Sequence, residues 1–558
     1  MPSRWWGAVL SMPGACVVGM LRPVTDRRVT IPSFVLDLGR SPGAVGALVA
    51  GSIAIFAAGL DPKVLSSGMP DSQAALRQKP DLESLFLLSV IVQAGFFLIG
   101  GAIGDLFGRR RVLLVALTGL AMAEALAIVF PSGPGFAAAR VLAAAATGTV
   151  LPVALAVVAV TYTGAVRATA LGVAYAALGA ATAVAPALLL AVTPAVGRWP
   201  SFLLTAVFAV IAIWVVHRNV RLTGRSGLRV ADVAGHSIWA FGLLAITGGV
   251  VGIGSHPDSV IRWVLIVGGL ILLGVFLLWQ RRRDQASEDT AIDVRPVTVA
   301  LFAGVVIAVA QIAPSLEAPL FFRISQGSSA LLATVAIAPF VLALLVSGPI
   351  AGLLLSRYSP RVLIAGGLGV IGAGDVLFGQ AGTATPYTFF IVPLMAIGAG
   401  FVVGTCVRTA IIFASVPHRL PATAAALNQT SLVVGGQIGV SLVTTLVTAA
   451  AVASFNERAQ STPGVDVASE VSGFKSFLDA ISTAQFGDVI AELPHATKVD
   501  FAVSYAAGVG SAMTTIGLIA LAGAVVVWFA MGPKAPLTSV WEHRDERAAP
   551  PEAALADF

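Results

Sequence analysis

The sequence predicts an all-α integral membrane protein whose fourteen helices cross the lipid bilayer. Of its 558 residues, 57% are hydrophobic and only 11% are charged, whereas soluble domains carry about 25% charged residues. Soluble cores stop growing near about 250–300 residues, so this surplus of apolar side chains must face lipid. Apolar runs long enough to cross about 30 Å of hydrocarbon as a helix recur along the chain, whereas barrel strands would be shorter and would alternate in polarity.

The apolar runs form two sets of six, with two more runs between them. The expected spans are 44–66, 84–104, 112–130, 136–160, 168–193, 200–216, 236–254, 261–279, 297–316, 330–355, 361–380, 386–413, 422–452 and 503–530. This order predicts an N-terminal six-helix bundle over 43–216, two extra helices with linkers over 217–296, and a C-terminal six-helix bundle over 297–530. The last bundle includes a long polar outer loop, 453–500, and a charged tail follows at 531–558.

Lys and Arg concentrate in every second gap between the spans. The gap 105–111 alone holds three arginines, and the positive-inside rule places such gaps in the cytoplasm. Both ends of the fourteen-helix unit are then cytoplasmic, and we expect the plasma (inner) membrane of a bacterium. Within the N-terminal segment 1–42, the apolar stretch 5–21 is barely long enough to span. An interfacial helix, an extra span and a start site placed too early are all left open for it.

The composition argues against several other classes of function. The net charge is +6, but arginines in short gaps between apolar runs are typical of membrane retention and not of nucleic-acid binding. Cys16 and Cys406 both lie in apolar segments, so they offer neither a disulfide framework nor a metal site, and no lysine follows a glycine, which excludes a Walker A loop. We therefore expect no enzyme activity, no catalytic residue, no metal and no cofactor. The expected partners are a small-molecule substrate, protons and the lipid bilayer, and the chain is expected to be a monomer.

A short charged turn interrupts the apolar sequence in "GAIGDLFGRRRVLL", which starts at Gly101. Gly101 lets two helices approach closely, Gly108 permits a sharp turn, and Asp105 at a helix end can pair with an arginine or a helix N-terminus. Together with Arg109 and Arg110, these residues resemble the loop signature of the major facilitator superfamily, G-x-L-(A)-D-R-x-G-R-K/R. The resemblance implies a conformational latch between the halves of a transporter; the alternative is a plain positive-inside anchor.

A weaker copy of this signature, "GLLLSRYSPRVL", starts at Gly352. Arg357 and Arg361 match the signature, whereas Ser356 and Ser359 replace its aspartate and its second glycine. Transporters built from structural repeats show such degenerate copies in their second half. The copy therefore predicts an asymmetric latch.

Three further stretches resemble the fourteen-helix drug:proton antiporter branch of this superfamily. "GLDPKVLSSGMPDSQAAL" carries Asp61 and Pro70 but has Lys63 where a small polar residue is usual. "ARVLAAAATGTVLP" carries Arg140, and "NQTSLVVGGQIGVSL" starts at Asn428. The resemblance covers roughly residues 43–530 and implies the major facilitator fold, with two six-helix bundles and two linker helices. It also implies proton-driven export of lipophilic or amphipathic compounds by alternating access, with Asp61 as the proton carrier.

One motif of that branch is degenerate in this chain. Its fifth-helix signature, G-x-x-x-G-P-x-x-G-G, reads "ATAVAPALLL" at 181–190, so only Pro186 remains. Glycines in this motif allow close helix packing, and their loss leaves the direction of transport open. Uptake, export of an endogenous lipid or metabolite, and a non-transporting receptor or scaffold therefore stand beside multidrug efflux as alternatives.

Ionisable residues inside the predicted spans are functional candidates, because a charge at mid-bilayer costs roughly 2.5–3.5 kcal/mol on insertion scales. Counting along the helices at about 1.5 Å per residue places Glu124 and Arg140 at similar depth in the outer half. We expect them to form a proton-coupling or purely structural ion pair. Asp61 should lie near the outer end of its helix, as a proton carrier or a solvated helix end, with Lys63 facing elsewhere. Glu317 should lie at the outer water boundary.

The candidate substrate-binding residues lie in the second half of the chain. Asp375 is surrounded by glycines in "GVIGAGDVLFG", and Arg408 lies nearer the cytoplasmic end of its helix. Their depths differ by about 10 Å, so a direct ion pair between them is not expected. Asn428 and Gln437, in the stretch that resembles the thirteenth helix of the antiporter branch, complete the set. A locally bonded helix–helix contact is an equally good interpretation of Asp375.

Overall fold

Helices make up nearly all of the chain that the structure describes. The computed structural model describes residues 42–76, 81–131, 133–162, 166–181, 199–220, 260–284, 294–416, 421–462, 467–482 and 495–531, with isolated residues between 238 and 249. No strand occurs in these ranges. Eleven of the described helices are long and apolar enough to cross a membrane, and two shorter apolar helices, Val166–Ala181 and Val260–Phe276, accompany them. The expected span 236–254 falls almost entirely outside the described residues.

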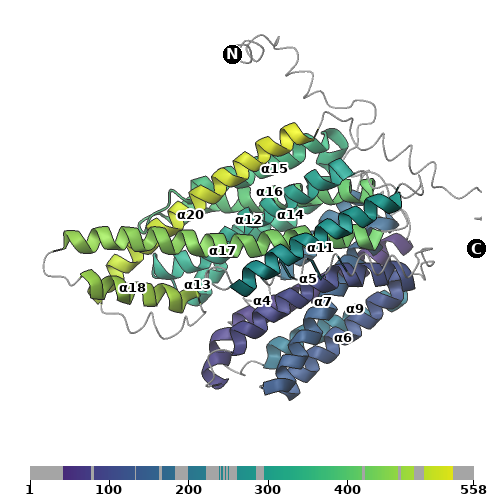
Figure 1. Cartoon of the computed structure of the whole chain (residues 1–558), viewed down its shortest axis with the longest axis horizontal. Helices are drawn as coiled ribbons and strands as arrows, with labels where there is room; N and C mark the ends of the chain where they lie inside the picture. The colour runs from purple at the N-terminus through teal and green to yellow at the C-terminus, as the bar shows by residue number, and fades with distance from the viewer. Residues whose placement is uncertain are drawn as a thin grey trace, which may run out of the picture.

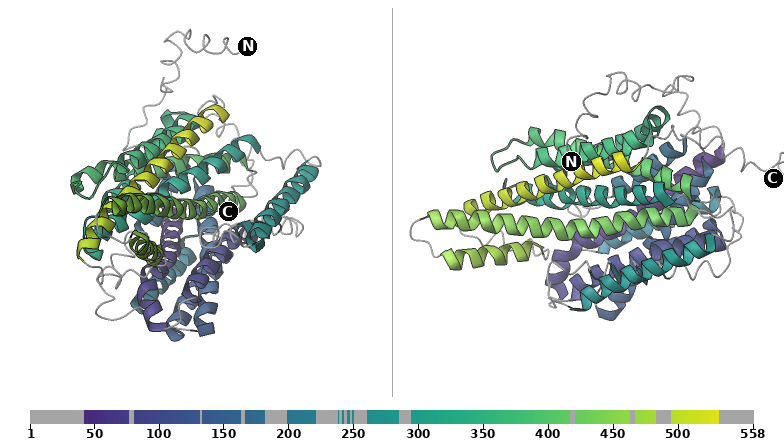
Figure 2. Two further views of the ribbon diagram at one scale, coloured as in Figure 1. Left: turned by 60° about the vertical axis from the view of Figure 1, so that its left-hand side comes forward. Right: turned by 45° about the horizontal axis from the view of Figure 1, so that its top comes forward.

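The N-terminal group of described helices overlaps all six predicted spans, but α4 continues ten residues past its predicted end and the fifth helix is described only as far as Ala181. Its members are α4 (Pro42–Leu76), α5 (Asp81–Phe107), α6 (Arg109–Val129), α7 (Gly133–Thr161), helix 166–181 and α9 (Trp199–Asn219). These helices occupy one side of the molecule in Figure 1. A single further helix, α11 (Val260–Asp284), lies along the outside of the bundle (Figure 2). Large apolar side chains are exposed on α11, as expected for a helix that faces lipid.

The C-terminal group contains more of the described helices, including the two longest, α17 and α20. Its described members are α12 (Val294–Ile324), α13 (Ala330–Val335), α14 (Ala338–Arg357), α15 (Pro360–Phe378), α16 (Tyr387–Ser415), α17 (Pro421–Ser461), α18 (Val467–Ser482) and α20 (His495–Ala530). The predicted span 330–355 is broken into α13 and α14, because a proline starts the second helix and cannot continue the first. Beyond the other helices, α17, α18 and the start of α20 extend together (Figure 1), and the rings of Phe455, Phe474 and Phe501 join them.

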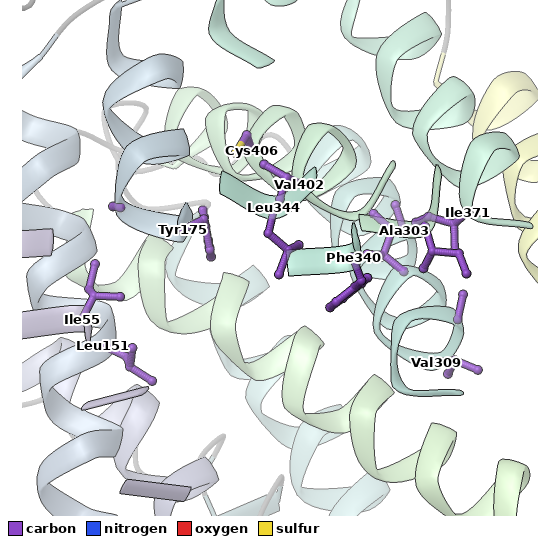
Figure 3. Packing of buried hydrophobic residues seen from close by; sticks show 14 of the residues in the cluster. Ile55, Leu151, Tyr175, Ala303, Val309, Phe340, Leu344, Ile371, Val402 and Cys406 are labelled. Atoms are coloured by element: carbon purple, nitrogen blue, oxygen red, sulfur yellow. The ribbon is translucent and has the colours of Figure 1, made fainter. Parts of the chain in front are cut away.

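The two groups meet at the end of the bundle that carries the turn 105–111, which we call the latch end; the opposite end is the far end. Toward that end, Leu98 in the second half of α5 and Ala426 near the start of α17 share one buried cluster. Helix 166–181 contacts α14 through its backbone, because a Cβ at Gly172 would fall on the carbonyl of Gly348. Another cluster runs from Ile55 in the N-terminal group to Leu344 in the C-terminal group (Figure 3). The two halves are therefore packed together at the latch end.

Candidate functional site

Arg140 on α7 holds two carboxylates in the interior of the N-terminal half. Its side chain is 1% exposed, and its Nη1 donates to Oδ1 of Asp61 on α4 at 2.6 Å. Its Nη2 lies 3.1 Å from Oε1 of Glu124 on α6. Because three helices each contribute one member, this ion triad links α4, α6 and α7 at a single point.

Helical periodicity brings these side chains inside. Glu124 follows the buried residues Leu113, Leu117 and Leu120 along one stripe of α6, so it points in the same direction as they do. Arg140 lies on α7 among buried residues of small volume, which leave room for its long side chain. Glu124 and Arg140 thus each lie on a buried, otherwise apolar side of their own helix, and these two sides face each other.

Aromatic rings cover the guanidinium of Arg140. The centroid of the Phe202 ring, on α9, lies 5.1 Å from Cζ of Arg140, and that of Phe136 lies 5.9 Å away. A ring face attracts a cation, and the attraction is stronger where water is excluded. The rings thus stabilise the positive charge while they close the site to solvent.

The two carboxylates of the triad differ in their surroundings. The side chain of Asp61 is 9% exposed, whereas that of Glu124 is 0% exposed. Asp61 accepts a hydrogen bond from Arg140, but neither oxygen of Glu124 has a hydrogen-bond partner among the described residues. Asp61 is therefore both the more tightly bound partner and the one nearer to water.

The contact between Glu124 and Arg140, predicted from their depth, is confirmed. The contact of Asp61 with the same guanidinium was not predicted, because depth along a helix does not reveal which neighbouring helix a side chain faces. Asp61 lies near the middle of α4, which runs from Pro42 to Leu76 and so continues past the predicted end at residue 66. Because Asp61 is also buried, the predicted position near the outer helix end is wrong, and so is the alternative of a solvated helix end. The side chains of Lys63 and Pro70 lie outside the described residues.

The first latch sequence forms the turn that was predicted. Gly108 has φ 93° and precedes the first residue of α6, a backbone conformation that favours glycine. Asp105 is buried, and Nε of Arg109 lies 3.4 Å from its Oδ1. Nη2 of Arg110 donates to the carbonyl of His217 at 2.7 Å, which fastens the turn to the end of α9. Gly101 is buried one turn before Asp105.

The second copy of the signature contributes differently. A Cβ at Gly352 would fall on Thr169 of helix 166–181, so this glycine packs against the opposite half. Arg361 stacks on Trp528 of α20 with its Cζ 4.2 Å from the ring centroid, and Arg357 is exposed at the end of α14. Gly352 thus contacts the N-terminal half, whereas Arg361 stacks on a helix of its own C-terminal half.

A buried polar cluster joins the halves near the latch end. The hydroxyl of Tyr175, on helix 166–181, accepts a hydrogen bond from Nδ2 of Asn428 at 2.6 Å and donates to Oε1 of Gln429 at 3.1 Å. Oγ1 of Thr409 donates to Oδ1 of Asn428 at 3.1 Å. The sequence signalled Asn428 but not Tyr175, although a tyrosine is uncommon in this chain, which has five.

The other C-terminal candidates are distributed over separate places. Arg408 donates to Oγ of Ser431 at 2.9 Å and lies 3.4 Å from the carbonyl of Asn428, so it is not paired with Asp375, as expected. Asp375 is completely buried on α15. Gln437 is half-buried on α17.

Glu317 differs from its predicted position at the outer water boundary. It is buried, and the hydroxyl of Tyr505 donates to its Oε2 at 2.6 Å. The reason is that α12 continues to Ile324 and α20 packs beside it, so Glu317 lies within the helix bundle. Of the degenerate motif at 181–190, only Ala181 is described, and it is buried.

Comparisons with known proteins agree with this architecture. The family model of the Major Facilitator Superfamily matches residues 45–440. The puromycin resistance protein pur8 of Streptomyces alboniger is 29% identical over 490 residues, which cover 85% of this chain and 87% of that protein. The tetracenomycin C resistance and export protein of Streptomyces glaucescens is 23% identical over 509 residues, covering 86% and 90%. The crystal structure of the human organic anion transporter MFSD10 superposes with a TM-score of 0.57 at 14% identity and covers 87% of this chain and 100% of that one. The predicted fold class is confirmed.

Proposed function

Because the chain belongs to the Major Facilitator Superfamily, we propose that it is a proton-coupled transporter that exports lipophilic or amphipathic compounds by alternating access. The names of two relatives, which describe resistance to puromycin and resistance to and export of tetracenomycin C, support export as the direction. The observation that carries proton coupling is the triad of Asp61, Arg140 and Glu124, in which one guanidinium serves two carboxylates.

Asp61 is the proposed proton carrier. With all three groups ionised, the triad carries one positive and two negative charges, so one bound proton cancels the surplus in a site that excludes water. Asp61 is the more accessible of the two carboxylates to a proton from water, because its side chain retains some exposure. Protonation of Asp61 removes its charge-assisted bond to Arg140. Arg140 then stays with Glu124, and α4 is released to move relative to α7.

The cross-half contacts at the latch end suggest how this release could reach the transport path. We propose that the latch end faces the cytoplasm, as the charge asymmetry predicts, so the described conformation is closed on that side. Opening requires the hydrogen bonds of Tyr175 to Asn428 and Gln429 to break. During this opening, the hydrogen bond from Arg110 keeps the turn 105–111 attached to α9 of its own half.

Proton and dye fluxes in everted membrane vesicles test this function. Lipophilic compounds from a panel should release protons from acidified vesicles that carry the wild-type chain. Asp61→Asn should abolish that release, because an amide cannot cycle a proton. Glu457→Gln makes the same kind of change at an exposed position of α17 and should behave as wild type.

Two results would contradict the proposal. If Asp61→Asn vesicles still transport dye with the pH dependence of wild type, the proton carrier is another group. If the wild-type chain moves no compound of the panel while it is correctly folded in the membrane, the proposed export of lipophilic compounds is wrong.

A further inference from the structure

Asp375 is a buried carboxylic acid in the C-terminal half whose side chain has no polar partner among the described residues. It is 0% exposed, and neither Oδ1 nor Oδ2 has a hydrogen-bond partner there. The other buried acids with described side chains are partnered: Glu317 accepts from Tyr505, Asp105 contacts Arg109, and both Asp61 and Glu124 contact Arg140. The burial of an acidic side chain without a polar partner at Asp375 therefore needs another explanation.

The stripe of α15 that carries Asp375 faces α20. Gly372, Asp375 and Gly379 are three and four residues apart and so share one side of the helix. A Cβ at Gly372 would lie 2.6 Å from the carbonyl oxygen of Gly517, and one at Gly379 would lie 2.7 Å from that of Gly510. The two helix backbones are thus in contact on both sides of Asp375.

A cavity of about 510 Å³ opens at the far end of this seam. Gly379, Gly510 and Thr514 line it at the point where α15 and α20 meet, and Ser511 and Arg458 line it farther out. The backbone N–H of Gly379 donates to the backbone carbonyl of Asp375 at 2.9 Å, so the cavity reaches α15 one helical turn along the backbone from Asp375. Hydroxyl groups in the lining can hold the water that a proton needs for its passage.

No charged group is close enough to neutralise Asp375 in the part of the chain that the structure describes. The titratable side chains with described positions on α15 and on the helices packed against it are Arg361 on α15; Arg295, Glu317 and Arg323 on α12; Arg357 on α14; Tyr387, Cys406 and Arg408 on α16; and Tyr505 on α20. Arg458, on α17, lines the outer part of the cavity. None of these groups forms an ion pair or a hydrogen bond with the Asp375 carboxyl.

We propose that Asp375 is a second proton-binding site, separate from the triad and reached through this cavity from the far end. An isolated carboxylate in an apolar interior is strongly disfavoured, so in this conformation Asp375 holds a proton. A metal cation would need several oxygen ligands, and the described residues contain no group of three or more acidic, His or Cys side chains that could hold one. The use of this proton site in coupling rests on the proposed transport function, but proton binding at Asp375 does not.

Infrared spectroscopy of the full-length protein in liposomes tests proton binding directly. At neutral pH, the spectrum should contain the carbonyl stretch of a protonated carboxyl group that disappears in Asp375→Asn and remains in the exposed control Glu457→Gln. Isotope labelling of aspartate should shift the same band in the wild-type chain, which keeps the test valid if the variant folds poorly. A wild-type spectrum with no protonated aspartate band would refute the proposal.

The route to Asp375 has its own test. In a chain with Cys16→Ala and Cys406→Ala, thiol modification of Ser511→Cys should measurably slow deuterium exchange of the Asp375 band. Modification of Arg111→Cys, at the latch end, should leave exchange unchanged. Equal effects at both positions, or none at Ser511, would refute access from the far end. A protein that transports nothing yet keeps this band would refute the proposed function and leave the proton site intact.

Discussion

Removal of Arg140 should be the most destabilising single change in the N-terminal half. Arg140→Met keeps a long side chain but leaves Asp61 and Glu124 buried without a counter-ion. Breaking a buried ion pair by removal of one partner costs about 3–5 kcal/mol. The upper part of this range is expected because one guanidinium neutralises two carboxylates and also lies over the rings of Phe136 and Phe202.

The assay is a mutant cycle read by thermal unfolding in detergent. Apparent midpoints are compared, because a membrane protein of this size need not unfold in one step. Adding Glu124→Gln and Asp61→Asn to Arg140→Met should recover part of the lost stability, since no unpaired charge then remains buried, although the two amides still lack partners. Arg458→Met, at an exposed arginine, is the matched control and should change little.

The cycle also provides the refutation. Contacting residues show interaction energies of about 0.5–3 kcal/mol, whereas distant ones are additive. Strictly additive losses for Arg140→Met and Glu124→Gln would mean that the two side chains do not meet. Recovered stability together with recovered transport would mean that the triad is only structural.

Three further changes test the orientation, the latch and the contact between the halves. In intact cells, an impermeant thiol reagent should label Ser461→Cys but not Arg111→Cys, and labelling at residue 111 from outside would reverse the proposed orientation. Asp105→Asn should slow transport at normal expression by removing a charge from the turn; unchanged turnover would reduce the turn to a topological anchor. Tyr175→Phe removes hydrogen bonds worth about 0.5–1.5 kcal/mol each. It should therefore increase thiol labelling of a cysteine at Leu98, and equal labelling would show that these bonds do not hold the latch end closed.

The transmembrane helices were predictable because length and apolar composition suffice to define them. Depth along a helix also sufficed to bring Glu124 and Arg140 together. It did not predict that Asp61 joins them or that Tyr175 reaches α17, since both contacts depend on how the helices are rotated about their axes. Only packing with other helices sets that rotation.

The error at Glu317 has a different physical origin. The predicted span ends at residue 316, one residue before Glu317, yet α12 continues to Ile324 with Pro314 and Pro319 inside it. Membrane helices tolerate proline because neighbouring helices can satisfy the backbone groups that it frees. A span bounded by its apolar run alone therefore ends too early here, and a buried acid is mistaken for a boundary residue.

In the proposed alternating-access cycle, the backbone contact between Gly172 and Gly348 bears on how fast the halves can separate. Side chains that interdigitate must change rotamers when helices slide past one another, and each rearrangement adds friction and loses or gains rotational freedom. Two glycines have no rotamers, so helix 166–181 and α14 present smooth surfaces to one another at this crossing. In the proposed cycle, the two helices can slide past each other at this crossing. The free-energy barrier to that movement then comes from the polar contacts around it.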